Sequence, residues 1–107
     1  MRLAGAKLGK RVYINSLSLN DYNLLEFGDD VVIGAGVHLS GHTVEGGVVK
    51  TAAVRLRQGT TVGLGAIVEI GVETGSHCEI GALSFVPKGM KLEGEAVYAG
   101  IPARQIE

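Results

Sequence analysis

A repeat of six residues governs the sequence between Leu56 and Leu92. An aliphatic or threonine side chain returns at every sixth position, and a smaller or second apolar side chain follows four residues after it. The first set comprises Leu56, Val62, Val68, Thr74, Ile80, Val86 and Leu92, and the second comprises Thr60, Ala66, Val72, Cys78, Ser84 and Met90. This period matches neither a helix nor a strand. It predicts short strands, each with two inward side chains flanking one outward residue, joined by corners.

Glycine occupies the positions between these strands. Glycine tolerates the positive φ angles and the close backbone approach that corners require. Strand and corner at a fixed spacing are typical of a solenoid, in which three repeats make one triangular coil of about 18 residues. Each strand then pairs with its copy one coil away as a parallel sheet. We therefore predict one all-β domain over residues 1–107, a parallel β-helix of about five coils.

The repeat is less regular near the N-terminus. Residues 1–26 are predicted to form irregular first coils, because the end coil of a repeat protein lacks a neighbour on one side. Their inward pairs are Leu8 with Val12 and Ile14 with Ser18. A slip of one residue follows over Asn20–Glu26, and regular pairs return from Phe27 as far as Leu39 with Thr43.

Two later segments also depart from the repeat. Residues 45–55 fit no hexad and are predicted to be a loop that protrudes from the prism at a corner, where functional residues concentrate. After Leu92 the repeat ends, and Pro102 cannot continue a sheet ladder. Residues 93–107 are therefore predicted to turn back and cap the last coil.

Composition and charge limit the partners of the chain. The net charge is −1, and charged residues, 20% of the chain, are scattered singly. This pattern offers no basic stripe for nucleic acid and no polybasic membrane anchor, so neither partner is expected. No signal peptide or spanning helix is visible, which favours a cytoplasmic location. The single cysteine, Cys78, excludes an internal disulfide and is predicted to be inert packing.

The outward positions of the regular block predict one apolar face. They are Thr61, Ile67, Glu73, Glu79, Phe85 and Lys91. Ile67 and Phe85 lie one coil apart on the same face, whereas the other two faces carry polar or charged pairs. We expect the Ile67 and Phe85 face to be buried between subunits.

Three segments together resemble the hexapeptide acyltransferases, such as the galactoside and maltose acetyltransferases. They are Ser40–Glu45 with its Gly-His, the region Val54–Gly63 before the hexads, and Tyr98–Arg104, which ends in Gly-Ile-Pro-Ala-Arg. The resemblance covers about Ile33 to Glu107. It implies a left-handed β-helix, a homotrimer with clefts between subunits, and acyl, probably acetyl, transfer from coenzyme A to a small hydroxyl or amino acceptor.

The same resemblance implies site residues. His42 matches the catalytic histidine and would be the general base, since a histidine titrates near neutral pH and can take a proton from the attacking group. Glu45 is its possible orienting partner. The residues implied for the donor site are Gly65, Ala66 and Ser84 along the groove, with Lys88 or Arg104 near the donor's phosphates. Acyl-coenzyme A would be a co-substrate, and no bound metal is implied.

This chain departs from the family at several positions. Thr43 stands where the family has proline, Arg57 replaces a glycine and Thr61 a tryptophan, and the acceptor-binding segment of the sugar acetyltransferases is missing. The acceptor therefore stays open. The alternative interpretation of His42 is a solvated corner residue, and His38 is expected to be an exposed outward residue.

Two further resemblances give alternative functions. The stretches Gly41–Glu45 and Gly81–Gly89 are similar to the C-terminal hexapeptide domain of nonribosomal synthetases of the poly-lysine synthetase kind. That similarity implies a non-catalytic trimeric binding or assembly module, or a donor thioester tethered to a carrier. A remote alternative is a zinc site like that of the γ-carbonic anhydrases, which share this architecture, formed by His38, His42 and His77.

Overall fold

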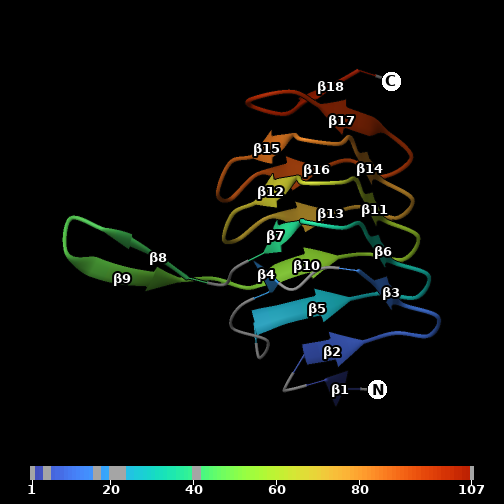
Figure 1. Ribbon diagram of the computed structural model, residues 1–107, viewed down its shortest axis with the longest axis horizontal. Helices are drawn as coiled ribbons and strands as arrows, with labels where there is room; N and C mark the ends of the chain where they lie inside the picture. The colour runs from blue at the N-terminus through green and yellow to red at the C-terminus, as the bar shows by residue number, and fades with distance from the viewer. Residues whose placement is uncertain (1, 4–5, 16–17, 20–23, 40–41, 107) are drawn as a thin grey trace.

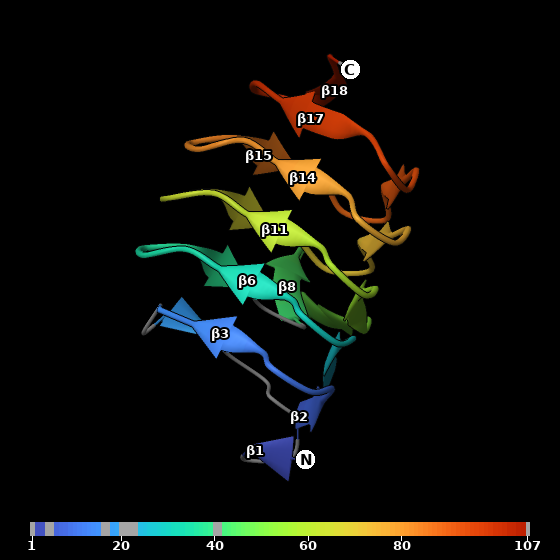
Figure 2. The same ribbon diagram turned by 90° about the vertical axis from the view of Figure 1, so that its right-hand side faces the viewer.

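Three columns of short parallel strands form the faces of a triangular prism, and a two-stranded hairpin projects from its side (Figure 1). The computed structural model describes residues 2–3, 6–15, 18–19, 24–39 and 42–106. The view turned by 90° shows the coils stacked one above another (Figure 2). The predicted parallel β-helix is therefore confirmed.

We name the faces sheets A, B and C in the order in which the chain visits them. Sheet A contains β1 (Arg2–Leu3), β2 (Ala6–Leu8), β5 (Leu25–Phe27), β10 (Val54–Leu56), β13 (Glu73–Thr74) and β16 (Lys91–Leu92). Sheet B contains β3 (Tyr13–Ile14), β6 (Val32–Ile33), β11 (Thr61–Val62), β14 (Glu79–Ile80), β17 (Val97–Ala99) and β18 (Arg104–Gln105). Sheet C contains β4 (Ser18–Leu19), β7 (His38–Leu39), β12 (Ile67–Val68) and β15 (Phe85–Val86).

Strand register confirms the predicted coil length. In the regular block the paired residues are Thr61 with Glu79, Ile67 with Phe85, and Glu73 with Lys91, each 18 residues apart. Between β5 and β10 the spacing is 29 residues, because eleven additional residues leave the prism there. The three outward pairs predicted from the sequence therefore lie on three different sheets, as expected.

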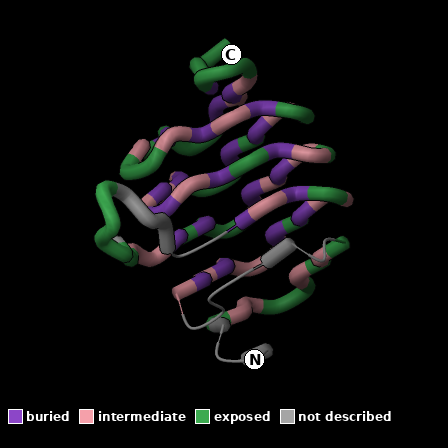
Figure 3. Tube along the Cα trace, turned by 60° about the vertical axis from the view of Figure 1, so that its left-hand side comes forward, coloured by how far each residue is buried: buried purple, intermediate pink, exposed green. Residues whose placement is uncertain are grey.

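The inward side chains of the repeat form the core. Leu56, Val68 and Ile80 expose 1% of their surface or less, and buried positions recur from coil to coil along the prism (Figure 3). Two inward threonines, Thr60 and Thr74, share a hydrogen bond of 2.8 Å between their hydroxyl oxygens. Each hydroxyl thus has a partner inside the core, where an unpaired polar group would be destabilising.

Coils approach most closely at the corners. A Cβ atom added to Gly75 would lie 2.4 Å from the backbone nitrogen of Gly94 in the next coil, so the stack excludes a side chain there. The third corner residue often has positive φ, as at Gly65 (φ 70°). These two requirements explain why glycine recurs at corner positions.

The repeat continues one step beyond the predicted end at Leu92. Ala96 and Tyr98 are buried, and β17 pairs in parallel with β14. Tyr98 fits an inward position because its hydroxyl accepts a hydrogen bond from the Glu93 backbone N–H at 2.9 Å. The predicted cap over 93–107 is therefore shorter, since residues 93–99 belong to a last coil.

The chain turns back only after this last coil. β18 pairs antiparallel with β17, and the backbone N–H of Ala103 donates to the Phe85 carbonyl at 2.8 Å. The tail thereby covers the C-terminal ends of sheets B and C. Strand β1, antiparallel to β2, covers the N-terminal end of sheet A in the same way.

The protruding segment also differs from the prediction. It is an antiparallel hairpin of β8 (His42–Glu45) and β9 (Val48–Thr51), with a turn at Gly46–Gly47. The protrusion therefore starts earlier than the predicted loop over 45–55, and it includes Thr43, which was expected inside the prism. Val54 returns to sheet A and is fully buried. Consecutive β-forming residues on both sides of two glycines favour a hairpin over an irregular loop.

The first coil shows how the early repeat shifts. Lys7 pairs with Glu26 at a spacing of 19 residues, whereas Ser18 pairs with His38 at 20. Ser18 therefore has the register of an outward residue, and the predicted inward pairing of Ile14 with Ser18 is wrong. The predicted slip over Asn20–Glu26 falls partly outside the described residues.

Candidate functional site

Three corners join the sheets, and each has its own chemistry. The A–B corner is charged and carries Lys10, Arg11, Asp29, Asp30, His77 and Glu95. The B–C corner, continued by the tail, is uncharged and carries Gly36, Leu64, Gly65, Leu83 and Ile101. The C–A corner carries the β8–β9 hairpin, Gly71, Lys88 and Gly89.

The predicted catalytic residues lie at the C–A corner. His42 is the first residue of β8 and pairs with Thr51, and Glu45 is the last residue of β8 and pairs with Val48 beside the turn. The side chains of both predicted residues fall outside the described part of the structure. Lys88, also predicted, lies exposed on the same corner two coils further on. The interpretation of His42 as a corner residue changes, because it begins a strand.

The predicted donor-groove residues lie at the other edge of sheet C. Gly65 is on the B–C corner, but Ala66 and Ser84 are buried and face the core. The Ser84 hydroxyl accepts a hydrogen bond from the backbone N–H of Gly100 at 3.1 Å, so it holds the tail. The side chains of Ala66 and Ser84 are therefore not available to line a groove on the surface. Arg104, in β18, is exposed at the C-terminal end.

Within one chain the predicted residues form two half-sites rather than one site. Sheet C separates the C–A corner from the B–C corner, and its outward residues include His38, Ile67 and Phe85 in register. Ile67 is 41% exposed, and His38 and Phe85 are half-buried. The apolar Ile67 and Phe85 pair thus lies between the two half-sites.

The B–C corner carries an apolar ridge that sequence analysis missed. Leu64, Leu83 and Ile101 expose 57%, 69% and 78% of their surface. Leu83 has φ of 57°, where the equivalent residue one coil earlier is Gly65, and its Cδ2 would lie 2.8 Å from a Cβ added to that glycine. Leucine at a corner position was the available signal. A bulky residue at positive φ is strained and marks a position worth functional attention.

The A–B corner contains a compact charged group. Arg11 binds the Asp30 carboxylate through two hydrogen bonds, of 2.6 and 3.0 Å, which hold the pKa of Asp30 below its usual value. The His77 ring lies over Gly59, where an added Cβ would be 2.4 Å from its Cδ2. His77 is thus on the A–B corner while His38 is on sheet C. Among the described residues no cluster of three or more histidine, cysteine or acidic side chains is arranged to hold a metal ion.

The outer face of sheet A carries a ladder of alternating charge. Its members are Lys7, Glu26, Arg55, Glu73 and Lys91. Arg55 Nε lies 2.8 Å from Glu26 Oε2, and Lys91 Nζ lies 3.0 Å from Glu73 Oε2. The hydrogen bond from Arg55 lowers the pKa of Glu26, and that from Lys91 lowers the pKa of Glu73. Only the last pair was visible in the regular repeat, because the hairpin displaces the earlier members from an 18-residue spacing.

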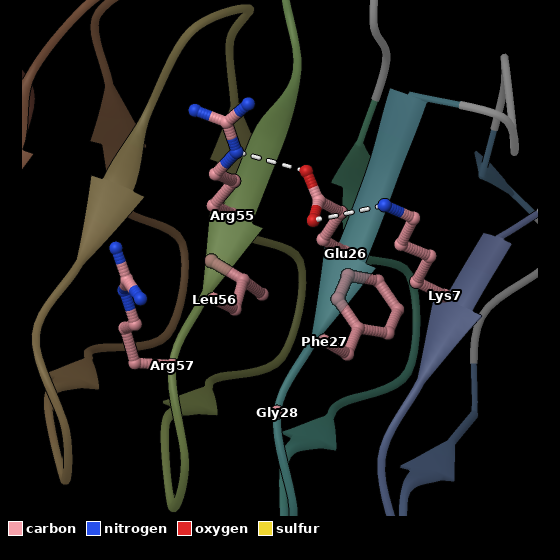
Figure 4. Close-up of a pocket in the computed structure, with 7 residues that line it drawn as sticks. All are labelled: Lys7, Glu26, Phe27, Gly28, Arg55, Leu56 and Arg57. Carbon is pink, nitrogen blue, oxygen red and sulfur yellow. Dashed lines mark hydrogen bonds and ion pairs between the residues drawn. The ribbon is translucent and has the colours of Figure 1, made fainter. Parts of the chain in front are cut away.

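A shallow depression of about 210 Å³ lies on this face and is drawn in Figure 4. Its lining residues are Lys7, Glu26, Phe27, Gly28, Arg55, Leu56 and Arg57. Glu26 is already bound by Arg55 and lies 3.9 Å from Lys7. Sheet A is therefore a self-neutralised face, in contrast to the apolar sheet C.

In the described part of the chain, no helix is long and apolar enough to cross a membrane. No family model matches the sequence. The chain is 22% identical over 103 residues to the delta-poly-L-ornithine synthetase of Acinetobacter baumannii, which covers 96% of this chain but 8% of that protein.

Two solved structures share the fold over nearly the whole chain. A hexapeptide-repeat acetyltransferase of Vibrio cholerae, complexed with acetyl coenzyme A, has a TM-score of 0.86 at 17% identity and covers 97% of this chain and 60% of its own. Serine acetyltransferase of Brucella abortus, complexed with coenzyme A, has a TM-score of 0.78 at 28% identity, covering 95% and 39%. The chain spans well under two thirds of these proteins. It has the left-handed parallel β-helix fold of the hexapeptide-repeat acetyltransferases and a distant similarity to the synthetase.

Proposed function

We propose that this protein transfers an acyl group, preferably acetyl, from coenzyme A to a small hydroxyl or amino acceptor at clefts between three copies of the chain. The observation that carries this proposal is the likeness to serine acetyltransferase bound to coenzyme A, at 28% identity over 95% of the chain. A hairpin that begins at His42 leaves the prism beside the region where the family resemblance places the catalytic histidine.

The separation of the half-sites supports a composite cleft. The C–A and B–C corners bound sheet C on either side, and sheet C carries the apolar pair Ile67 and Phe85. If three prisms turn sheet C toward a common axis, the C–A corner of one copy lies beside the B–C corner of the next. His42 and Lys88 of one copy would then face Gly65 of its neighbour. A heterologous contact of this kind closes into a ring when the rotation permits it.

The proposed chemistry needs few groups. The His42 imidazole takes the proton from the acceptor hydroxyl or amine as that atom attacks the thioester carbonyl, with Glu45 as a possible orienting group. A backbone N–H at the corner stabilises the oxyanion that forms. The carbon–sulfur bond then breaks, and the protonated imidazole returns the proton to the departing thiolate of coenzyme A. Lys88 or Arg104 would bind the donor's phosphates.

Replacing His42 with alanine tests this mechanism. We expect calorimetric binding of acetyl coenzyme A to persist while the rate of coenzyme A release onto an acceptor falls at least tenfold, since general base catalysis typically contributes about 10²- to 10⁴-fold. His77→Ala is the matched control, because the A–B corner lies outside the proposed cleft, and its turnover should be unchanged. Normal turnover in His42→Ala would eliminate the mechanism.

A non-catalytic assembly module is the second candidate. The similarity to delta-poly-L-ornithine synthetase over 96% of the chain favours it, because this chain matches only a small part of that protein. The module predicts stable trimers that neither bind nor hydrolyse acyl-coenzyme A at millimolar concentration. It would bind a partner protein or a carrier-tethered thioester instead.

A further inference from the structure

We propose that the tip of the β8–β9 hairpin of one copy packs on the Leu64–Leu83–Ile101 ridge of the next copy, and so fixes the position of the hairpin that begins at His42. This inference rests on the assembly part of the proposed function and not on its chemistry. It identifies the two surfaces that must meet, which the apolar face of sheet C alone does not do.

The hairpin needs a partner that its own prism does not supply. It is a separate two-stranded sheet that projects away from the prism (Figure 1). Val48 and Val49 at its tip are 58% and 63% exposed. An isolated hairpin of two strands is only marginally stable in water, and two exposed valines beside a Gly-Gly turn offer an apolar contact surface. Covering these valines would stabilise the hairpin.

The ridge is the complementary surface on the same chain. Leu83 combines positive φ with 69% exposure, so neither backbone preference nor burial within the chain accounts for a leucine there. Leu64 lies beside it on the preceding coil, where its carbonyl accepts a hydrogen bond from the Leu83 N–H at 2.8 Å. Contact with a second apolar surface would remove this ridge from water.

The positions of the two surfaces select a second copy as the occupant. The hairpin leaves from the C–A corner, where Ala52 packs at Gly71, whereas the ridge lies on the B–C corner across sheet C. Each chain therefore carries one apolar patch at each edge of the same sheet. Two different patches that fit each other make a head-to-tail contact, which a ring of three prisms closes.

Cysteine cross-linking tests this contact directly. Chains with Val49→Cys and chains with Leu83→Cys are refolded together, oxidised, and separated on a non-reducing gel, with a size tag on one chain. We expect mixed dimers only when both variants are present, because the contact joins unlike surfaces. Val49→Cys mixed with Glu79→Cys, on sheet B, is the control and should give few. Equal cross-linking in each variant alone, or none in the mixture, would overturn the proposal.

The double variant Val49→Cys/Leu83→Cys separates a contact between copies from one within a chain. We expect covalent species of up to three chains, whereas a disulfide closed within one chain would overturn the proposal. Leu83→Gly adds an independent measurement, since glycine suits the positive φ and should leave the monomer folded. The dissociation constant of the assembly should rise at least tenfold in that variant, and an unchanged constant would also overturn the proposal.

The assay of the cross-linked trimer keeps this inference distinct from the proposed function. Cross-links in the expected pattern without any acyl transfer would sink the enzymatic proposal and leave the contact intact. Acyl transfer by a protein that gives no cross-links would do the reverse.

Discussion

At the scale of single residues, Cys78 shows how the solenoid core suppresses reactivity. It is 1% exposed, and burial, with a smaller contribution from the Glu79 charge, raises the pKa of its thiol to about 11. At pH 8 only about one molecule in a thousand would carry the thiolate, the reactive form. We expect Ellman's reagent to label the folded protein slowly and to reach one thiol per chain only after guanidinium unfolding. Rapid stoichiometric labelling of the folded protein would contradict this assignment.

The inward threonines show what the sequence could and could not predict for single residues. The hexad phase placed Thr60 and Thr74 inside correctly, because period alone decides which side chains face the core. It did not indicate that their hydroxyls meet across a corner, or that Tyr98 extends the inward column. These outcomes depend on hydrogen-bond partners that come together only in the folded coil.

At the scale of elements, the charge ladder of sheet A is a device for a solvated face. Glu26 accepts a hydrogen bond from Arg55 at 2.8 Å and is partly exposed, so we expect Glu26→Gln to destabilise the fold by only about 0.5–1 kcal/mol at low salt. The loss should shrink in molar salt, which screens such pairs. Thermal unfolding at two salt concentrations measures it. Glu93→Gln is the control, since the ladder does not include that residue.

The pH dependence of the same variant follows from the lowered pKa of Glu26. A carboxyl whose folded-state pKa lies below its ordinary value of 4.5 stabilises the fold at higher pH, and that contribution is lost as the pH falls toward the folded-state pKa. The wild-type advantage over Glu26→Gln should therefore be present at pH 7 and vanish on acidification below about pH 4. An advantage that grew on acidification would refute this assignment.

The elements also mark the limit of sequence-based prediction. The regular strands followed from the hexads, because each is fixed by which side chains must enter the core. The hairpin over His42–Thr51 did not, since it contributes nothing to the repeat and its strands are stabilised by each other. The candidate site divides in the same way. Lys88 and Gly65 lie at the predicted corners, whereas the inward direction of Ala66 and Ser84 conflicts with a lining role that only the resemblance suggested.

At the scale of the whole molecule, the three faces of the prism have different relations to water. Sheet A carries a neutralising ladder, sheet B mixes Thr61 and Glu79 in its regular block, and sheet C presents Ile67 and Phe85. A short solenoid has a thin core, so the apolar sheet is the face from which association gains most. We expect Phe85→Glu to dissociate the proposed trimer, because three carboxylates near the common axis would repel one another and lose hydration. Light scattering coupled to size exclusion measures the mass, and Glu79→Gln on sheet B should leave it unchanged. Circular dichroism of the dissociated variant should retain the β-helix signal, since Phe85 points out of the prism beside Val86, which stays buried. A variant that remains a trimer would show that sheet C is not the interface, and the composite cleft between the C–A and B–C corners would then be lost with it.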